Sequence, residues 1–82
     1  MVKLSILSAR KIIKVLENLG FKIVRQKGSH IQFKHTDGRF TTVPNHPSRD
    51  VGVGLLRKIL RDIEISPEEF SKYVRWKHYK QV

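Results

Sequence analysis

The chain has 82 residues, of which 17 are Lys or Arg and 7 are Asp or Glu, so its net charge is +10, and it contains no cysteine. This length allows one small domain, residues 1–82, and the lack of cysteine excludes disulfides and thiolate metal sites as sources of stability. No apolar run is long enough to cross a membrane and no signal peptide is recognisable, so we expect a cytoplasmic protein without a membrane partner.

The positive charge is concentrated in the first part of the chain. Residues 1–49 hold ten Lys or Arg against two acidic residues, Glu17 and Asp37. This excess predicts a polyanionic partner, and nucleic acid is the first candidate because cations that neutralise phosphates release bound counterions. The alternative is a basic surface that serves only solubility.

The first predicted element is a helix over residues 9–19. Ser8 is a suitable N-cap, Gly20 can end the helix in the left-handed conformation, and apolar residues recur between them at helical spacing. The opposite face carries Arg10, Lys11 and Lys14. These three cations have two interpretations: a surface that follows an RNA backbone, or an ordinary solvated helix face.

Three strands are expected next, over residues 21–27, 30–35 and 40–43. In the first strand the alternation is imperfect, with Phe21, Ile23 and Arg25 assigned to one side. In the second strand it is regular: Ile31 and Phe33 point one way, and the other side carries His30, Gln32 and Lys34. The Asp37-Gly38 pair predicts a hairpin, so the strands should form an antiparallel meander.

The rest of the chain is predicted to be mainly helical. After a proline-containing loop over 44–49, helical spacing resumes over residues 52–63, with Asp50 as a possible N-cap. Ser66, Pro67 and Glu69 together mark the start of a short C-terminal helix. Its tail carries Trp76 and Tyr79, which could stack on bases or pack on the domain. We therefore predict an α+β fold of α-β-β-β-α order, with a three-stranded antiparallel sheet, helices on one face and a short C-terminal helix.

His30 is the main candidate for chemistry, because it follows the Gly28-Ser29 turn and lies among cations. An imidazole ordinarily titrates near pH 6.5, so it can take the proton of an RNA 2′-hydroxyl at neutral pH. Lys27, Lys34 and Arg25 could stabilise charge on the phosphate, and the turn could offer backbone N–H groups to it. No metal or other cofactor is required. The alternative is an ordinary exposed histidine on a strand.

Two further histidines, His35 and His46, lie near the predicted sheet. His46 lies between two prolines and could supply the second proton, contact a phosphate or have only a structural role in the loop. His35 does not share the parity of His30, and we expect it at the surface beside the hairpin. Strand parity disfavours a metal site formed by these three histidines.

Three segments resemble the HicA (YcfA-like) family of mRNA interferase toxins. They are "KIIKVLENLGFKIVRQKGSHIQFKH", "VPNHP" and "GLLRKILRDIEISPEEF", and they span about residues 8–70. The resemblance implies a double-stranded-RNA-binding-like fold, cleavage of mRNA by a metal-independent endoribonuclease, and neutralisation by a HicB-type antitoxin. The histidine of the family's Gly-Ser-His turn is catalytic, which assigns that role to His30.

The expected RNA contacts follow from the basic helix face, the turn, the second strand and the loop. They are Arg10, Lys11, Lys14, Lys27, Gly28, Ser29, Lys34 and His46. The main rival function is an RNA-binding module without catalysis that uses the same basic face. A third possibility is a protein whose main role is to bind an acidic protein partner.

Overall fold

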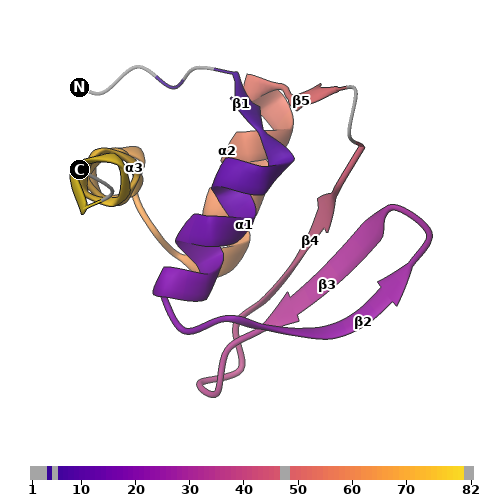
Figure 1. The fold of residues 1–82 in the computed structure, drawn as a ribbon. Helices are drawn as coiled ribbons and strands as arrows, with labels where there is room; N and C mark the ends of the chain where they lie inside the picture. The colour runs from indigo at the N-terminus through magenta and orange to yellow at the C-terminus, as the bar shows by residue number, and fades with distance from the viewer. Residues whose placement is uncertain (1–3, 5, 47–48, 81–82) are drawn as a thin grey trace.

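The computed structural model describes residues 4, 6–46 and 49–80, and for residues 75–80 it describes only the backbone. The elements in chain order are β1 (Leu7–Ser8), α1 (Ala9–Asn18), β2 (Lys22–Lys27), β3 (His30–Lys34), β4 (Phe40–Pro44), β5 (Asp50–Val51), α2 (Val53–Ile63) and α3 (Pro67–Lys80). Strands β2, β3 and β4 form an antiparallel sheet, and α1 and α2 lie together on one face of it (Figure 1). The predicted α+β fold is confirmed.

Helix α1 begins and ends as the sequence predicts. The Ser8 side chain accepts a hydrogen bond from the Lys11 backbone N–H at 3.3 Å, which satisfies one of the free donors of the first turn. At the other end Gly20 has a φ of +97°, and the Phe21 N–H donates back to the Leu16 carbonyl at 2.9 Å. This bond and the left-handed glycine form a Schellman motif.

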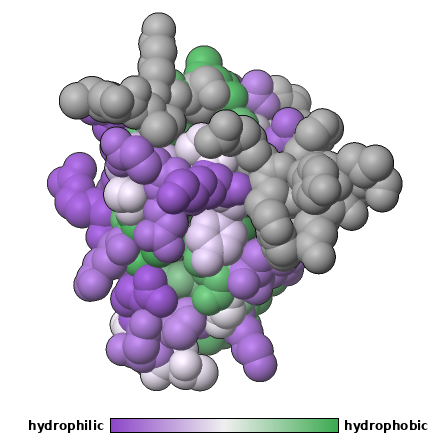
Figure 2. Space-filling model, turned by 90° about the vertical axis from the view of Figure 1, so that its left-hand side faces the viewer, coloured by the Kyte–Doolittle hydropathy of each residue, from purple (hydrophilic) through white to green (hydrophobic). Residues whose placement is uncertain are grey.

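One hydrophobic core lies between the helices and the sheet. The inward-facing residues of the sheet are almost completely buried: Ile31 is 4% exposed, and Phe33 and Val43 are 0% exposed. They pack against the apolar stripes of α1 and α2 and against Phe70 of α3. From the side shown in Figure 2, hydrophilic side chains cover most of the described surface, with smaller apolar areas between them. The amphipathic helices thus bury one face and expose the other.

Strand β2 contains a β-bulge at Val24, which the sequence analysis did not predict. Ile23 pairs with Phe33 and Arg25 with Gln32, so two steps along β2 correspond to one step along β3. An extra residue in one strand changes the face to which the following side chains point. The assignment of Arg25 to the same side as Ile23 was therefore wrong.

A second, two-stranded sheet joins the start of α1 to the start of α2. Leu7 pairs with Val51 and Ser8 with Asp50 in β1 and β5. Asp50 lies in β5. The prediction that Asp50 is the N-cap of α2 was therefore wrong. The N-cap is Gly52, which makes no side-chain capping bond.

The predicted C-terminal helix is present as α3, and it extends into the tail of the chain. Ser66 accepts a hydrogen bond from the Glu69 N–H at 3.1 Å, and Phe70 is buried. The helical backbone continues to Lys80. The side chains of Trp76 and Tyr79 lie outside the described residues, so their predicted roles stay predictions. Across the described ranges, α3 and the other helices all fall short of the length and apolar character needed to cross a membrane.

Candidate functional site

His30 is exposed at the start of β3, on the side of the sheet that faces away from α1 and α2. Its neighbour Ile31 is buried on the helix side, and adjacent residues of a strand point to opposite faces. We call the surface that His30 shares the open face; across the three strands it comprises Lys22, Arg25, Lys27, His30, Gln32, Lys34, Phe40, Thr42 and Pro44. The predicted placement of His30 is confirmed, whereas its chemical role stays a prediction.

The open face carries four cations and no acidic residue. Lys27 pairs directly with His30 across the β2–β3 hairpin, and side chains so opposed have Cβ atoms about 4.5–5.5 Å apart. Lys34 is also exposed, but it lies four residues along β3, about 13 Å from His30 at the usual rise. The structure therefore brings Lys27 to His30 and leaves Lys34 at the other end of the strand.

The β-bulge adds a cation that strict alternation would have placed elsewhere. Because of the extra residue Val24, Arg25 pairs with Gln32 and lies on the open face between Lys22 and Lys27. All six residues of β2 are exposed. Lys22 and Arg25 thus extend the basic surface away from His30, and no local feature of the sequence separates this register from a regular one.

The turn before His30 is tied to the segment that follows β4. Gly28 has a φ of +59°, a backbone conformation that residues with a Cβ rarely adopt. The Asn45 N–H donates to the Ser29 carbonyl at 2.7 Å, and the Ser29 Oγ lies 3.4 Å from His46 Nε2. His46 is thus held beside the residue that precedes His30, and its predicted roles as a proton donor or phosphate contact stay predictions.

The basic face of α1 borders a cleft of about 450 Å³, which we call the α1 cleft. On the helix side it is lined by Arg10, Lys14 and Glu17. On the other side it is lined by Asn45, His46, Arg49 and Asp50. Lys11 is exposed on the same helix but does not line the cleft. The three predicted helix contacts therefore separate into two in the cleft and one outside it.

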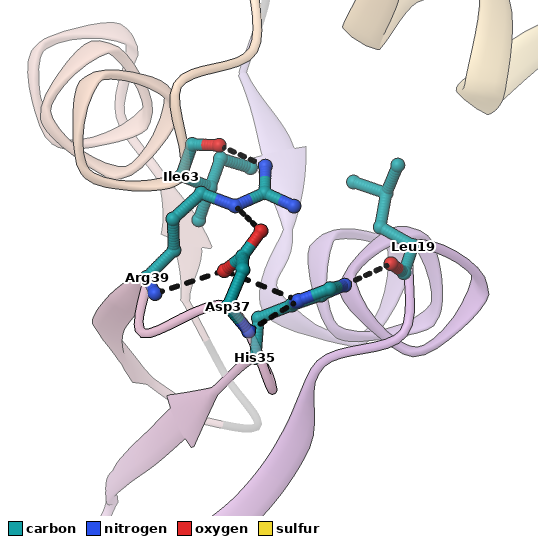
Figure 3. Close-up of polar contacts among 5 residues, drawn as sticks. All are labelled: Leu19, His35, Asp37, Arg39 and Ile63. Carbon is teal, nitrogen blue, oxygen red and sulfur yellow. Dashed lines mark hydrogen bonds and ion pairs between the residues drawn. The ribbon is translucent and has the colours of Figure 1, made fainter.

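His35 belongs to a different cluster, so the expectation of a surface histidine was wrong. Its side chain is 20% exposed, and its Nε2 lies 3.2 Å from the Leu19 carbonyl (Figure 3). A carbonyl can only accept, so Nε2 carries the proton, while Nδ1 accepts the Asp37 N–H at 3.1 Å. The ring also packs edge-on against Phe21, with centroids 5.1 Å apart.

Arg39 completes this cluster. Its Nη1 donates to the Ile63 carbonyl at 2.6 Å and its Nε to Asp37 at 2.8 Å (Figure 3). The hydrogen bond from the Arg39 backbone N–H is the main cause that holds the pKa of Asp37 below its ordinary value. The cluster thereby joins the β3–β4 hairpin to the C-terminal ends of α1 and α2, a structural role that parity with buried Phe33 could have suggested for His35.

Among the residues that the structure describes, no three His, Asp or Glu side chains lie close enough together to hold a metal ion. A family model described as "HicA toxin of bacterial toxin-antitoxin" matches residues 9–65. The match begins with α1 and ends just after α2, so it includes the open face, the Gly28-Ser29 turn and every lining residue of the α1 cleft except Ser8. A search of curated proteins found no match.

Proposed function

The chain belongs to the HicA toxin family of bacterial toxin–antitoxin systems, and we propose that it acts in the cytoplasm as a metal-independent endoribonuclease that cleaves mRNA. The observation that carries this proposal is the pairing of exposed His30 with Lys27 on a surface with four cations and no acid. A proton acceptor and a cation side by side suit the attack of a 2′-hydroxyl on its phosphate.

The proposed reaction moves protons between His30 and the RNA. His30 takes the 2′-hydroxyl proton as the 2′-oxygen attacks the adjacent phosphorus, which forms a 2′,3′-cyclic phosphate and breaks the bond to the 5′-oxygen. Lys27 stabilises the negative charge that grows on the phosphate oxygens. We assign the return of a proton to the leaving 5′-oxygen to His46, because its position beside Ser29 brings it to the turn before His30.

Other predicted contacts hold the RNA chain. Arg25 and Lys34 bind the phosphate backbone along the open face, where sequence-independent ion contacts position the strand without selecting its bases. Gly28 and Ser29 shape the turn that presents His30. Lys11 adds charge beside the cleft, on the exposed side of α1.

The family implies an antitoxin partner, and we propose that this is a HicB-type protein. The open face has four cations and no acidic residue, so an antitoxin that covers His30 should present Asp or Glu side chains to it. A complex that leaves His30 open to solvent and the basic face uncovered would contradict this.

The second candidate function is an RNA-binding module without catalysis, which the same basic face favours. To separate the two, the purified protein and its His30→Ala variant are incubated with a long RNA in EDTA. Gln32→Ala, on the same strand and the same face, is the matched control. The proposal requires cutting by the unchanged protein and by Gln32→Ala but not by His30→Ala. Cutting that survives in His30→Ala rejects His30 as the base, and RNA binding without any cutting supports the binding module.

A further inference from the structure

The α1 cleft is a hollow of the described surface that does not belong to the open face. We propose that it holds one unpaired nucleotide of the RNA, the one next to the bond that is cut, and that it favours bases with an exocyclic amino group over uracil. This inference rests on the proposed endoribonuclease function and adds a preference for certain bases to it. The volume of about 450 Å³ falls in the range of about 300–1,000 Å³ that is typical of small-molecule sites.

The cations of the cleft suit a phosphate. Arg10 and Lys14 line it from α1, and Arg49 lines it from the opposite side. All three side chains are exposed, so a nucleotide could enter without displacing a buried ion pair. A phosphate between the two walls would be within reach of cations from both sides.

The acidic residues of the cleft provide the base preference. Glu17 of α1 and Asp50 of β5 both line the cleft, and within the described part of the chain the ion pairs of carboxylates involve only Asp37 and Asp62. An ionised carboxylate only accepts hydrogen bonds. It can therefore pair with the amino group of cytosine, adenine or guanine, whereas uracil presents a carbonyl oxygen where cytosine has its amino group. Unpaired bases are commonly recognised through such edges.

The position of His46 connects the cleft to the proposed reaction site. His46 lines the cleft, and its Nε2 lies 3.4 Å from Ser29 Oγ, one residue before His30. An RNA strand whose sugar and phosphate lie at His30 would therefore reach the cleft with the adjoining nucleotide. That nucleotide is splayed away from its neighbour, as single-stranded RNA readily allows.

The test uses cytidine and uridine monophosphate, titrated into the isotope-labelled protein and followed by nuclear magnetic resonance. Cytidine monophosphate should shift the backbone signals of Arg10, Asn45 and Arg49, and it should bind roughly two- to tenfold more tightly than uridine monophosphate, the gain of about one net hydrogen bond. Equal binding of the two nucleotides, or shifts confined to the open face, would overturn the proposal.

Two pairs of variants test the walls of the cleft. Lys14→Ala should weaken the binding of both nucleotides by up to about fivefold, the range for an exposed ion contact. Lys72→Ala, exposed on α3 and not part of the cleft, should leave it unchanged. The double substitution Glu17→Gln and Asp50→Asn should bring the ratio of the two affinities close to one, because an amide can also donate to uracil; Glu64→Gln, exposed at the end of α2, should preserve it. The site would be rejected if each variant and its control changed the measured affinity, or the ratio of affinities, by the same amount.

An RNA cutting assay on the unchanged protein separates this inference from the function on which it rests. Cutting without nucleotide binding in the cleft would reject the nucleotide site and leave the endoribonuclease standing. Nucleotide binding without cutting would reject the proposed catalysis, and with it the statement that the bound nucleotide flanks a cut.

Discussion

Lys27 and His30 are direct cross-strand partners at the end of the β2–β3 hairpin, on either side of the Gly28-Ser29 turn. The two-residue turn and the antiparallel register together set this relationship. The cation nearest to the proposed base is thus held by backbone hydrogen bonds of the sheet, while Lys34, on the same strand as His30, lies at its other end.

Lys27→Ala should slow RNA cutting far more than Lys34→Ala does. If Lys27 stabilises the phosphate during the reaction, its loss should lower the rate at saturating RNA by roughly a hundredfold, the typical cost of one such charge-stabilising group. Lys34→Ala should mainly weaken RNA binding. Single-turnover rates at saturating RNA measure the difference, and equal rates for the two variants would exclude a special role for Lys27.

Arg25→Ala should reduce the salt dependence of RNA binding. One phosphate contact contributes about 0.7 to the slope of log affinity against log salt for a single strand. Arg25 lies on the open face only because of the bulge at Val24, so the slope also tests that register. Binding by the His30→Ala protein is measured between low and physiological salt. Arg61→Ala, on the exposed surface of α2, is the control. An identical slope with and without Arg25 would contradict the proposal that Arg25 contacts an RNA phosphate.

Gly20→Ala should destabilise the fold by more than the roughly 1–2 kcal/mol that the left-handed conformation costs a residue with a Cβ. The φ of Gly20 is +97°, and an added Cβ would lie 3.0 Å from His35 Nε2. In a His35→Ala background the contact is gone and only the backbone strain remains, so the same substitution should cost less. Urea unfolding of the four proteins measures this, and an equal cost in both backgrounds would show that the contact is unimportant.

Asp37 should make folding stability depend on pH in the acidic range. Its pKa in the folded protein lies below the ordinary value of 3.8, so above that pH the folded state holds the carboxylate with favourable interactions that the unfolded chain lacks. This contribution is lost as the pH falls below about 4 and through the folded pKa. In Asp37→Asn the decline in the free energy of unfolding between pH 5 and pH 2.5 should be shallower; an unchanged decline would reject the role of Asp37.

The helices and the order of the strands were predictable because each depends on a local pattern. The spacing of Ile12 and Leu16 and the caps at Ser8 and Gly20 determine α1 within a single stretch of chain. The alternation around Ile31 likewise predicted that His30 would face away from the helices. These signals are repeated within a few residues and do not depend on which other segment lies nearby.

The features that were missed depend on distant pairing. The bulge at Val24 becomes visible only when β2 is aligned with β3, and the pairing of Ser8 with Asp50 joins segments far apart in sequence. The position of His35 follows from Leu19 and Phe21, which it meets after the sheet has folded against α1. The residues that line the α1 cleft come from two separate stretches, 8–17 and 45–50, so no single stretch of sequence shows it.

The small sheet of β1 and β5 also has a consequence for motion. It consists of only two residue pairs, and both members of one pair, Ser8 and Asp50, line the α1 cleft. A ladder this short has few hydrogen bonds to lose, and such regions open locally at a free energy well below that of global unfolding. Amide hydrogen exchange should therefore be faster in β5 than in the central strand β3. Local opening of the β1–β5 sheet would then determine how fast a nucleotide enters and leaves the α1 cleft.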